Sequence, residues 1–354
     1  MFQNPRGTRD FTSEEMQKRN YLEASIKKVF QIYGYNEIET PTFENLELFT
    51  AKSGEGIISE IYSFKDKGDR ELALRPELTA PVMRFYVEKL QMEPKPLKLF
   101  YFGNCYRYDR PQKVRYREFK QAGCELIGTN TPEAIAELIS MAYKILENSG
   151  LKNMELKIGN LKILQSIFEK IDLKKEQIDY IIPLIDKELF EELYSALQEF
   201  GLDNKTITNF IDLLKTENIN KIKEFAGSES EDEINRFEKI VELVKKTFKI
   251  KNFKVTLGIV RGLDYYTGTV FEIEVPSLGA EKQICGGGEY QLVSLFGGRE
   301  TYTSGFAIGF DRVLLALETE GYSFPENYID AFVIPVTKEM TNKAIEITET
   351  LRDN

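Results

Sequence analysis

The chain has 354 residues, enough for two or three domains, and its 42% hydrophobic content is typical of a globular protein with a sizeable core. Its net charge of −10 excludes a generally basic nucleic-acid-binding surface, although a local basic patch stays possible. The sequence contains no histidine, which excludes Ser-His-Asp and Cys-His catalysis and any histidine-ligated metal. Chemistry must therefore rest on arginine, lysine, carboxylates, hydroxyls or a hard cation such as magnesium.

The cysteines and the N-terminal sequence indicate in which cellular compartment the protein is expected. Cys105, Cys124 and Cys285 are widely spaced and odd in number, which predicts reduced thiols rather than a disulfide framework or a zinc site. The N-terminus has no apolar signal region, and no run approaches the roughly 18 apolar residues of a membrane span. We therefore expect a cytoplasmic protein that does not associate with a membrane.

Two helices have clear start signals. Thr12 and Glu15 have the spacing of a capping box, and apolar residues then recur at helical spacing, which predicts a helix from about 13 to 33. Thr131 followed by Pro132 predicts the start of a second helix, which Gly150 would end.

The segments between and after these helices predict strands. The runs 62–64, 72–74, 97–102 and 124–127 are apolar and are separated by turns or charged loops, and further strands are expected at 255–260 and 269–273. The connections are short, which favours antiparallel pairing. We therefore predict an α+β fold, in which an antiparallel sheet is flanked by helices.

The chain divides by composition. Residues 1–158 and 252–327 would form two parts of one core, and 159–251 would form a helical insertion domain, because glycine is sparse there and apolar residues follow helical spacing. The run 331–336 predicts a strand and 338–351 a helix, after which the chain stops. We expect 328–354 to begin an α/β domain that this chain does not complete.

The segment from Arg261 to Tyr266 lies between two predicted strands and carries an arginine and two phenols. Strand ends hold side chains more rigidly than loops do, so these groups could bind a small polar substrate. An ordinary polar hairpin is the alternative interpretation.

The segment 104–121 reverses the charge of the chain, with Arg107, Arg110, Lys113, Arg115, Arg117 and Lys120 against only Asp109 and Glu118. Guanidinium groups bind phosphate oxygens in pairs, so this hairpin suits a phosphate ligand. A solvated charged hairpin is the alternative.

Three further motifs carry polar or small residues at predicted strand ends. Glu77 and Thr79 could bind a substrate ammonium group, or Glu77 could simply sit at a helix N-terminus. The run Gly286–Gly288 allows close approach of the backbone to a ligand, or forms a plain turn. The run 305–314 predicts a strand that leads into a helix, with Arg312 in the first turn, where it would suit a polyphosphate.

In this order, these residues resemble the class II aminoacyl-tRNA synthetases, and among them the histidyl-tRNA synthetase family. The resemblance spans about residues 1–335 and rests on Arg6–Asp10, Pro41, Arg75-Pro76-Glu77 with Thr79, Arg107 through Glu125, Arg261–Tyr266, the triple glycine and Gly309–Arg312. It implies a class II catalytic core that activates histidine with ATP and Mg²⁺ and transfers it to tRNA(His). It also implies a homodimer through the Pro41 region, tRNA contacts from the helical insertion and an anticodon-binding domain beginning at 328.

The resemblance also implies roles for single residues. Arg107 would bind the α-phosphate and the substrate carboxylate, Arg261 would stabilise the transition state, and Arg115 and Arg312 would bind the β- and γ-phosphates, with Mg²⁺ held mainly by ATP. The remaining implied roles are Glu77, Thr79 and Gln121 for the ammonium group, Glu125 and Tyr266 for the imidazole with Tyr265 nearby, Gly286, Gly287 and Gly288 for backbone approach, and Arg110, Gln112 and Lys113 for the tRNA acceptor end.

The sequence departs from the family pattern after the glycine run. The family usually continues with Arg-Tyr-Asp-Gly-Leu, whereas Glu289-Tyr290-Gln291-Leu292-Val293 stands here, so the charge at position 289 is reversed. Two other functions remain open: a non-catalytic regulatory subunit of ATP phosphoribosyltransferase in histidine biosynthesis, and a module that binds uncharged tRNA without ATP chemistry.

Overall fold

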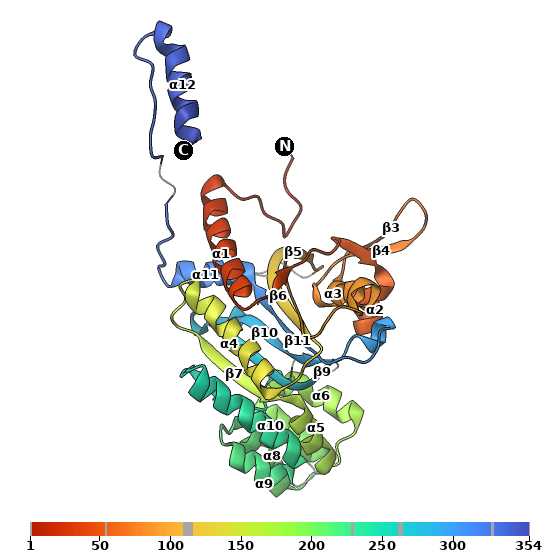
Figure 1. The fold of residues 1–354 in the computed structure, drawn as a ribbon. Coiled ribbons are helices and arrows are strands. Elements are labelled where there is room, and N and C mark those ends of the chain that lie inside the picture. Colours follow the sequence, from red (N-terminus) through yellow and green to blue (C-terminus); the bar gives the residue numbers. More distant parts are fainter. Residues whose placement is uncertain are drawn as a thin grey trace.

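The computed structural model describes residues 2–53, 55–108, 116–227, 230–260, 265–326 and 329–353. Its centre is an eight-stranded sheet with the order β1-β5-β6-β11-β10-β9-β7-β8 (Figure 1). Among these strands only the pairs β1–β5 and β7–β8 are parallel, so the predicted antiparallel α+β core is confirmed. The strands are β1 (Asn36–Glu37), β5 (Leu97–Tyr106), β6 (Glu118–Ile127), β7 (Glu155–Asn160), β8 (Phe253–Val255), β9 (Tyr266–Glu274), β10 (Gln283–Tyr290) and β11 (Thr303–Gly309).

Alternation along β5 and β6 gives the sheet two different faces. Phe100 and Cys124 belong to a core that also includes α1 (Ser13–Ile32) and α4 (Pro132–Asn148). Leu99, Tyr101 and Ile127 belong to a second core on the other face, together with residues of α3 (Thr79–Phe85). Successive side chains of a strand point to opposite faces, so one apolar run supplies both cores.

Both predicted helix starts are confirmed. The Thr12 hydroxyl accepts a hydrogen bond from the Glu15 amide at 3.3 Å, and the Glu15 carboxylate accepts one from the Thr12 amide at 2.7 Å. Thr131 caps α4, and Pro132 occupies its first turn. Helix α11 (Phe310–Thr319) follows β11 directly, as predicted.

A small second sheet has the order β2-β4-β3, formed by β2 (Phe43–Asn45), β3 (Ser63–Lys65) and β4 (Glu71–Leu74). It joins the main sheet through Arg75, a buried side chain directly after β4. The Arg75 guanidinium donates to the Asn104 carbonyl at 2.8 Å and to the Thr40 carbonyl at 2.7 Å. The other elements of this region are α2 (Leu46–Ser53), η1 (Glu55–Glu60) and η2 (Tyr86–Leu90).

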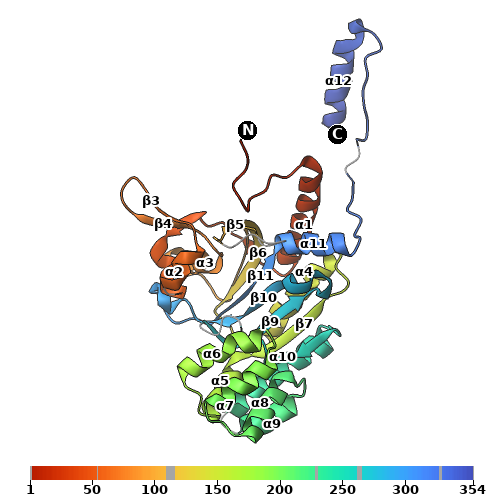
Figure 2. The ribbon, with the colours of Figure 1, turned by 180° about the vertical axis from the view of Figure 1, so that it is seen from behind.

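Helices occupy the chain between β7 and β8, as predicted, and lie below the sheet in both ribbon views (Figures 1 and 2). Each buries one apolar stripe, as an amphipathic helix does. They are α5 (Leu161–Lys170), α6 (Lys175–Asp186), α7 (Phe190–Glu199), α8 (Asn204–Lys215), α9 (Ile219–Ala226), α10 (Glu231–Glu242) and η4 (Leu243–Thr247). The division of the chain into domains stays a prediction.

Two strand predictions were wrong. Strand β8 ends at Val255, and 256–260 is irregular, although Leu257 and Val260 are buried; the apolar run reflects burial of a connection rather than a strand. The Thr256 hydroxyl accepts from the Gly258 amide at 3.0 Å, a local turn that replaces strand pairing.

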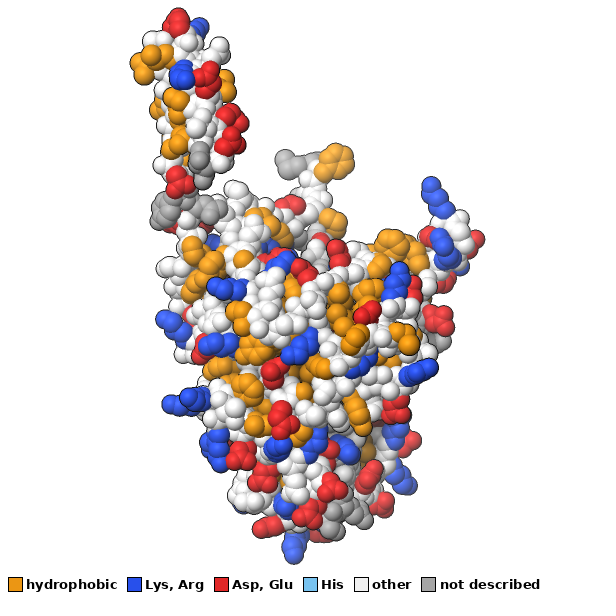
Figure 3. Space-filling view, in the orientation of Figure 1, with side chains coloured by type: hydrophobic (Ala, Val, Ile, Leu, Met, Phe, Trp, Pro, Cys, Tyr) orange, Lys and Arg blue, Asp and Glu red, His pale blue; other side chains and the backbone are white. Residues whose placement is uncertain are grey.

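The predicted strand at 331–336 is also absent. Phe332 and Ile334 are 78% and 68% exposed, and a strand cannot form without a neighbour to accept its hydrogen bonds. The predicted helix does form as η7 (Lys338–Met340) and α12 (Thr341–Arg352). It stands apart from the rest of the molecule and exposes apolar side chains (Figures 1 and 3).

No helix of the described residues is both long and apolar enough to cross a membrane. The shorter elements that complete the described fold are η5 (Pro276–Glu281) and η6 (Ser294–Phe296).

The glycine run lies inside β10, so its interpretation as a turn was wrong. A Cβ atom on Gly287 would lie 2.3 Å from the Gly305 carbonyl oxygen, and one on Gly288 would lie 2.6 Å from the Thr269 carbonyl oxygen. A Cβ atom on Gly286 would crowd the end of the Gln283 side chain, at 2.9 Å, and would otherwise make an ordinary contact with the Phe271 carbonyl oxygen, at 4.0 Å. Two of the three glycines are therefore required by the neighbouring strands.

We predict that Gly287→Ala lowers the free energy of unfolding by about 3 kcal/mol, because backbone must move to relieve the overlap. Gly286→Ala should stay within about 1 kcal/mol of the parent, because a flexible side chain can move instead. Urea denaturation of the two variants measures this, and equal losses would contradict the account of β10.

Candidate functional site

A cavity of about 710 Å³ opens over the face of β6 that carries Gln121 and Glu125. Its walls come from β9, β10 and β11, from the ends of α2 and α3, and from the first turn of α11. This volume is within the usual range for pockets that hold small ligands.

Most of the predicted site residues line this one cavity. Gly288 is not part of the lining, because it packs against β9. Arg110, Gln112, Lys113, Arg115 and Arg261 lie outside the described residues. The predicted residues that the fold brings together are Glu77, Thr79, Arg107, Gln121, Glu125, Tyr265, Tyr266, Gly286, Gly287 and Arg312.

Glu125 is the most deeply buried acid of the cavity, with 1% of its surface exposed. Its carboxylate accepts hydrogen bonds from the Tyr101 hydroxyl at 2.9 Å and from the Tyr290 hydroxyl. A Cβ atom on Gly305 would lie 2.0 Å from this carboxylate, so glycine is needed there. Burial raises the pKa of Glu125 to about 7, although hydrogen bonds from Tyr290, Tyr101 and Thr79 oppose the rise.

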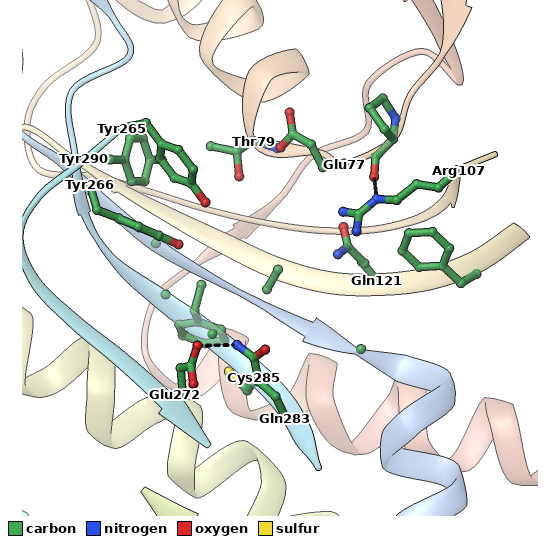
Figure 4. Close-up of a pocket in the computed structure, with 18 of the residues that line it drawn as sticks. Glu77, Thr79, Arg107, Gln121, Tyr265, Tyr266, Glu272, Gln283, Cys285 and Tyr290 are labelled. Atoms are coloured by element: carbon green, nitrogen blue, oxygen red, sulfur yellow. Dashed lines mark hydrogen bonds between the residues drawn. The ribbon is translucent and has the colours of Figure 1, made fainter. Parts of the chain in front are cut away.

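Three tyrosines form a wall beside Glu125. The rings of Tyr265 and Tyr266 have centroids 4.4 Å apart, and those of Tyr266 and Tyr290 are 6.4 Å apart. Figure 4 shows them gathered on one side of the cavity, with Arg107 on the opposite side. Such a wall can stack against a flat ring, while the buried carboxylate binds its polar edge.

Glu77 has a structural task as well as a place in the cavity. Its carboxylate accepts from the Thr79 amide at 2.7 Å and from the Ala80 amide at 3.1 Å, at the start of α3. The alternative prediction, that Glu77 lies at a helix N-terminus, is therefore confirmed, although the side chain also lines the cavity. Lys52 Nζ lies 3.4 Å from Oε1 of the same carboxylate, so a ligand ammonium group would share Glu77 with Lys52.

The two described arginines of the cavity are held by backbone carbonyls. Arg107 donates from Nε to the Pro76 carbonyl at 3.0 Å, and its guanidinium lies 5.2 Å from the Phe119 ring centroid. Arg312 donates to the Gln283 carbonyl at 2.8 Å and pairs with Glu281. Both cations are therefore oriented before any ligand arrives.

Asp311 fixes the position from which Arg312 reaches the cavity. Its carboxylate pairs with Arg9 at 2.8 Å and with Arg19 at 2.7 Å, and it accepts from the Lys120 amide at 3.0 Å. These bonds tie the start of α11 to β6 and to the N-terminal segment.

Gln121 and one of the three thiols, that of Cys285, line the cavity. The Cys105 thiol donates to the Gln121 side-chain oxygen at 3.2 Å. Cys105, Cys124 and Cys285 are free and buried, and burial raises the pKa of Cys105 to about 12. No group of three or more Cys, Asp or Glu side chains among the described residues could hold a metal ion.

Sequence reasoning missed several residues of the cavity and its margin: Lys52, Tyr101, Glu272, Gln283 and, as a hydrogen-bond partner of Glu125, Tyr290. The alternation along 97–106 could have placed Tyr101 on the same face as Leu99. Lys52 stands near the end of a short helix, and no local pattern indicates that it reaches Glu77.

Comparisons with known proteins identify the family. A model described as histidyl-tRNA synthetase matches residues 7–313. The chain is 47% identical to the histidine–tRNA ligase of Methanosarcina acetivorans, over 88% of this chain and 74% of the relative. It is 48% identical to that of Archaeoglobus fulgidus, over 90% of this chain and 76% of the relative. The chain belongs to the histidyl-tRNA synthetase family.

Solved structures agree with this family and with a class II core. The chain superposes with a TM-score of 0.71 on apo histidyl-tRNA synthetase from S. aureus, at 30% identity, covering all of this chain and 81% of the other. It superposes with a TM-score of 0.89 on a Bacillus halodurans protein described as an ATP phosphoribosyltransferase regulatory subunit/histidyl-tRNA synthetase, at 25% identity, covering all of this chain and 91% of the other.

We predict that Glu125 makes stability depend on pH. Its pKa of about 7 in the folded state is above the ordinary value of 4.5, so the folded protein binds this proton more tightly than the unfolded chain does. The stability of the parent relative to Glu125→Gln should fall by about 3 kcal/mol as pH rises from below 4.5 to above 7.

Denaturant unfolding of both proteins across that pH range measures the difference. The glutamine variant lacks the titrating group but keeps the shape and two polar atoms. Parallel stability curves for parent and variant would show that Glu125 does not titrate in this way.

Proposed function

We propose that this protein activates histidine with ATP to form histidyl-adenylate, releases diphosphate, and transfers the histidyl group to tRNA(His). The observation that carries the proposal is one cavity lined by Glu125 with tyrosines and by Arg107 with Arg312, in a chain of the histidyl-tRNA synthetase family. The acid and phenols suit an amino acid with a polar ring, and the guanidinium groups suit a nucleotide.

The first step needs placed charge rather than a base. The histidine carboxylate is already ionised, so it can attack the α-phosphorus without a side-chain base, which agrees with a chain that has no histidine. Arg107 would bind the α-phosphate and the substrate carboxylate, and Arg312 the terminal phosphates. Arg261 and Arg115 lie outside the described residues and keep their predicted roles, Arg261 at the α-phosphate in the transition state and Arg115, with Arg312, at the β- and γ-phosphates.

The part of the cavity that contains Glu125, Glu77 and the tyrosines, its amino-acid side, would recognise both ends of histidine. Glu125 and the Tyr266 hydroxyl would bind the two imidazole nitrogens, with Tyr265 beside them, and Glu77, Thr79 and Gln121 would bind the ammonium group. An analogue without the ring nitrogens would leave the buried polar groups unpaired. A site of this kind can reject such an analogue by roughly 10⁴-fold.

Magnesium would be bound mainly by the phosphates of ATP and would offset their charge. Glu272 lines the same cavity and accepts from the Gln283 amide at 2.8 Å. One carboxylate in the cavity proposed to hold the phosphates fits magnesium, which usually takes one or two carboxylates together with phosphate oxygens.

Several broader predictions belong to the same proposal. A homodimer through the Pro41 region is supported by Phe43 and Phe64, whose rings lie 6.5 Å apart and are 53% and 42% exposed. The helical segment 159–251 would contact tRNA, and 328–354 would begin an anticodon-binding domain. A cytoplasmic location stays a prediction.

The regulatory-subunit alternative is not favoured. Relatives at 41–48% identity are named histidine–tRNA ligases, whereas the Bacillus halodurans structure whose description includes a regulatory subunit is 25% identical. A module that binds uncharged tRNA without ATP chemistry would have no use for Arg312, so ATP affinity unchanged in Arg312→Ala would favour that module.

We predict that Arg107→Ala slows histidine-dependent exchange of pyrophosphate into ATP by roughly 100- to 1,000-fold, because an oriented cation at the reacting phosphate is lost. Arg352→Ala is the matched control, since Arg352 is exposed on α12 and pairs with Glu349 there. A parent protein without histidine-dependent exchange would contradict the proposed function.

A further inference from the structure

The reversed charge at position 289 has a partner in the helical segment. Glu289 is 8% exposed, and its two carboxylate oxygens accept hydrogen bonds from Arg236 of α10, one from Nη2 at 2.5 Å and the other from Nη1 at 3.0 Å. Arg236 also donates to the Asn130 carbonyl at 2.6 Å. A two-point pair of this kind fixes geometry as well as charge, and it joins α10 to β10.

Glu289 stands where the pairing of β9 and β10 is interrupted. Gly288 pairs with Val270 and Tyr290 with Tyr266, so three residues of β9 lie opposite Glu289 alone. The Glu289 carboxylate accepts from the Thr269 amide at 2.8 Å, in place of a backbone acceptor. A Cβ atom on Gly268 would lie 2.7 Å from the same carboxylate, so the bulge closes around it.

The bulge determines the positions of two side chains that line the cavity. Tyr266 and Tyr290 pair directly after it, both line the cavity, and the Tyr290 hydroxyl donates to Glu125. The labelled hydroxyls of Tyr265 and Tyr266 and the ring of Tyr290 lie together in Figure 4, away from Arg107. Movement at Glu289 would therefore reach the amino-acid side of the cavity first.

Arg236 and Glu289 are largely buried, so water could not easily replace the hydrogen bonds between them. Thr269 is fully buried, and the side chains of Arg236 and Glu289 are 20% and 10% exposed. Burial acts to lower the pKa of Arg236, but the hydrogen bonds and charges of Glu289 and, less strongly, of Glu233 raise it overall. Removing Arg236 would leave the Glu289 carboxylate largely buried without its cationic partner. Neutralising Glu289 would leave Arg236 with the Glu233 carboxylate of its own helix, at 3.4 Å.

We propose that the Arg236–Glu289 pair positions Tyr266, Tyr290 and through them Glu125, so that α10 of the helical segment controls how well the cavity binds histidine. The inference rests on the proposed function for the identity of the ligand. Arg236 and Glu289 are positioning residues, because neither lines the cavity. Arg107 lies outside β9 and β10, and Arg312 is held at the other end of β10, by the Gln283 carbonyl, so we expect ATP binding to depend little on the pair.

The test compares Arg236→Gln, Glu289→Gln and the double variant in histidine-dependent ATP–pyrophosphate exchange. Each single variant should raise the KM for histidine about tenfold and leave the KM for ATP within about twofold. The double variant should be no worse than the worse single variant, because the two changes break one interaction.

Lys239→Gln is the matched control. Lys239 also lies on α10 and forms an ion pair with Glu133, but this pair is on the surface, with both side chains more than half exposed. It should leave both KM values unchanged. If a glutamine variant does not fold, Arg236→Lys keeps the charge and should show a smaller rise in the KM for histidine alone.

Equal rises in both KM values, or single effects that add in the double variant, would overturn the inference. Histidine binding measured by calorimetry separates it from the proposed function. A parent that binds histidine without exchange contradicts the proposed function, and the affinities of the variants then decide the inference. A parent that does neither overturns both.

Discussion

A carboxylate buried in the middle of the main sheet, that of Glu125, constrains everything around the cavity. A buried charge costs several kcal/mol unless hydrogen bonds satisfy it, and the hydroxyls of Tyr101 and Tyr290 supply these from two other strands. Gly305 on a third strand leaves the space that the carboxylate fills. The registers of β5, β6, β10 and β11 must therefore all be correct for one side chain to be accommodated. A ligand that brings a further N–H donor satisfies a group that the fold has already placed.

The arginines proposed to bind phosphate are supported in a different way. Arg107 and Arg312 are each held by a backbone carbonyl, that of Pro76 and that of Gln283, so their positions depend on main-chain geometry rather than on other charged side chains alone. Donors that are oriented in advance need little reorganisation when charge develops on a phosphate. Arg312 also pairs with Glu281, so the proposed polyphosphate would compete with a carboxylate for it. The two sides of the cavity are therefore supported differently. Hydroxyl groups of other side chains hold Glu125, whereas backbone carbonyls hold Arg107 and Arg312.

The parts of this molecule that could be predicted from sequence have local causes. Thr12 and Thr131 cap helices through bonds to residues three positions away, and alternation places strands, so α1, α4 and the antiparallel core follow from short patterns. The apolar run 256–260 misled because burial alone does not distinguish a strand from a packed connection. Glu289 could be recognised as unusual, but its partner Arg236 is 53 positions away, and nothing in either local sequence points to the other. The cavity was predictable residue by residue only through the family resemblance.

The most direct test of this account is a crystal structure of the protein with ATP and histidinol, an analogue of histidine that has no carboxylate and cannot react. The account predicts an imidazole nitrogen at about 3 Å from the Glu125 carboxylate, and the α-phosphate beside the guanidinium of Arg107. An imidazole bound elsewhere, or a nucleotide bound outside this cavity, would contradict it.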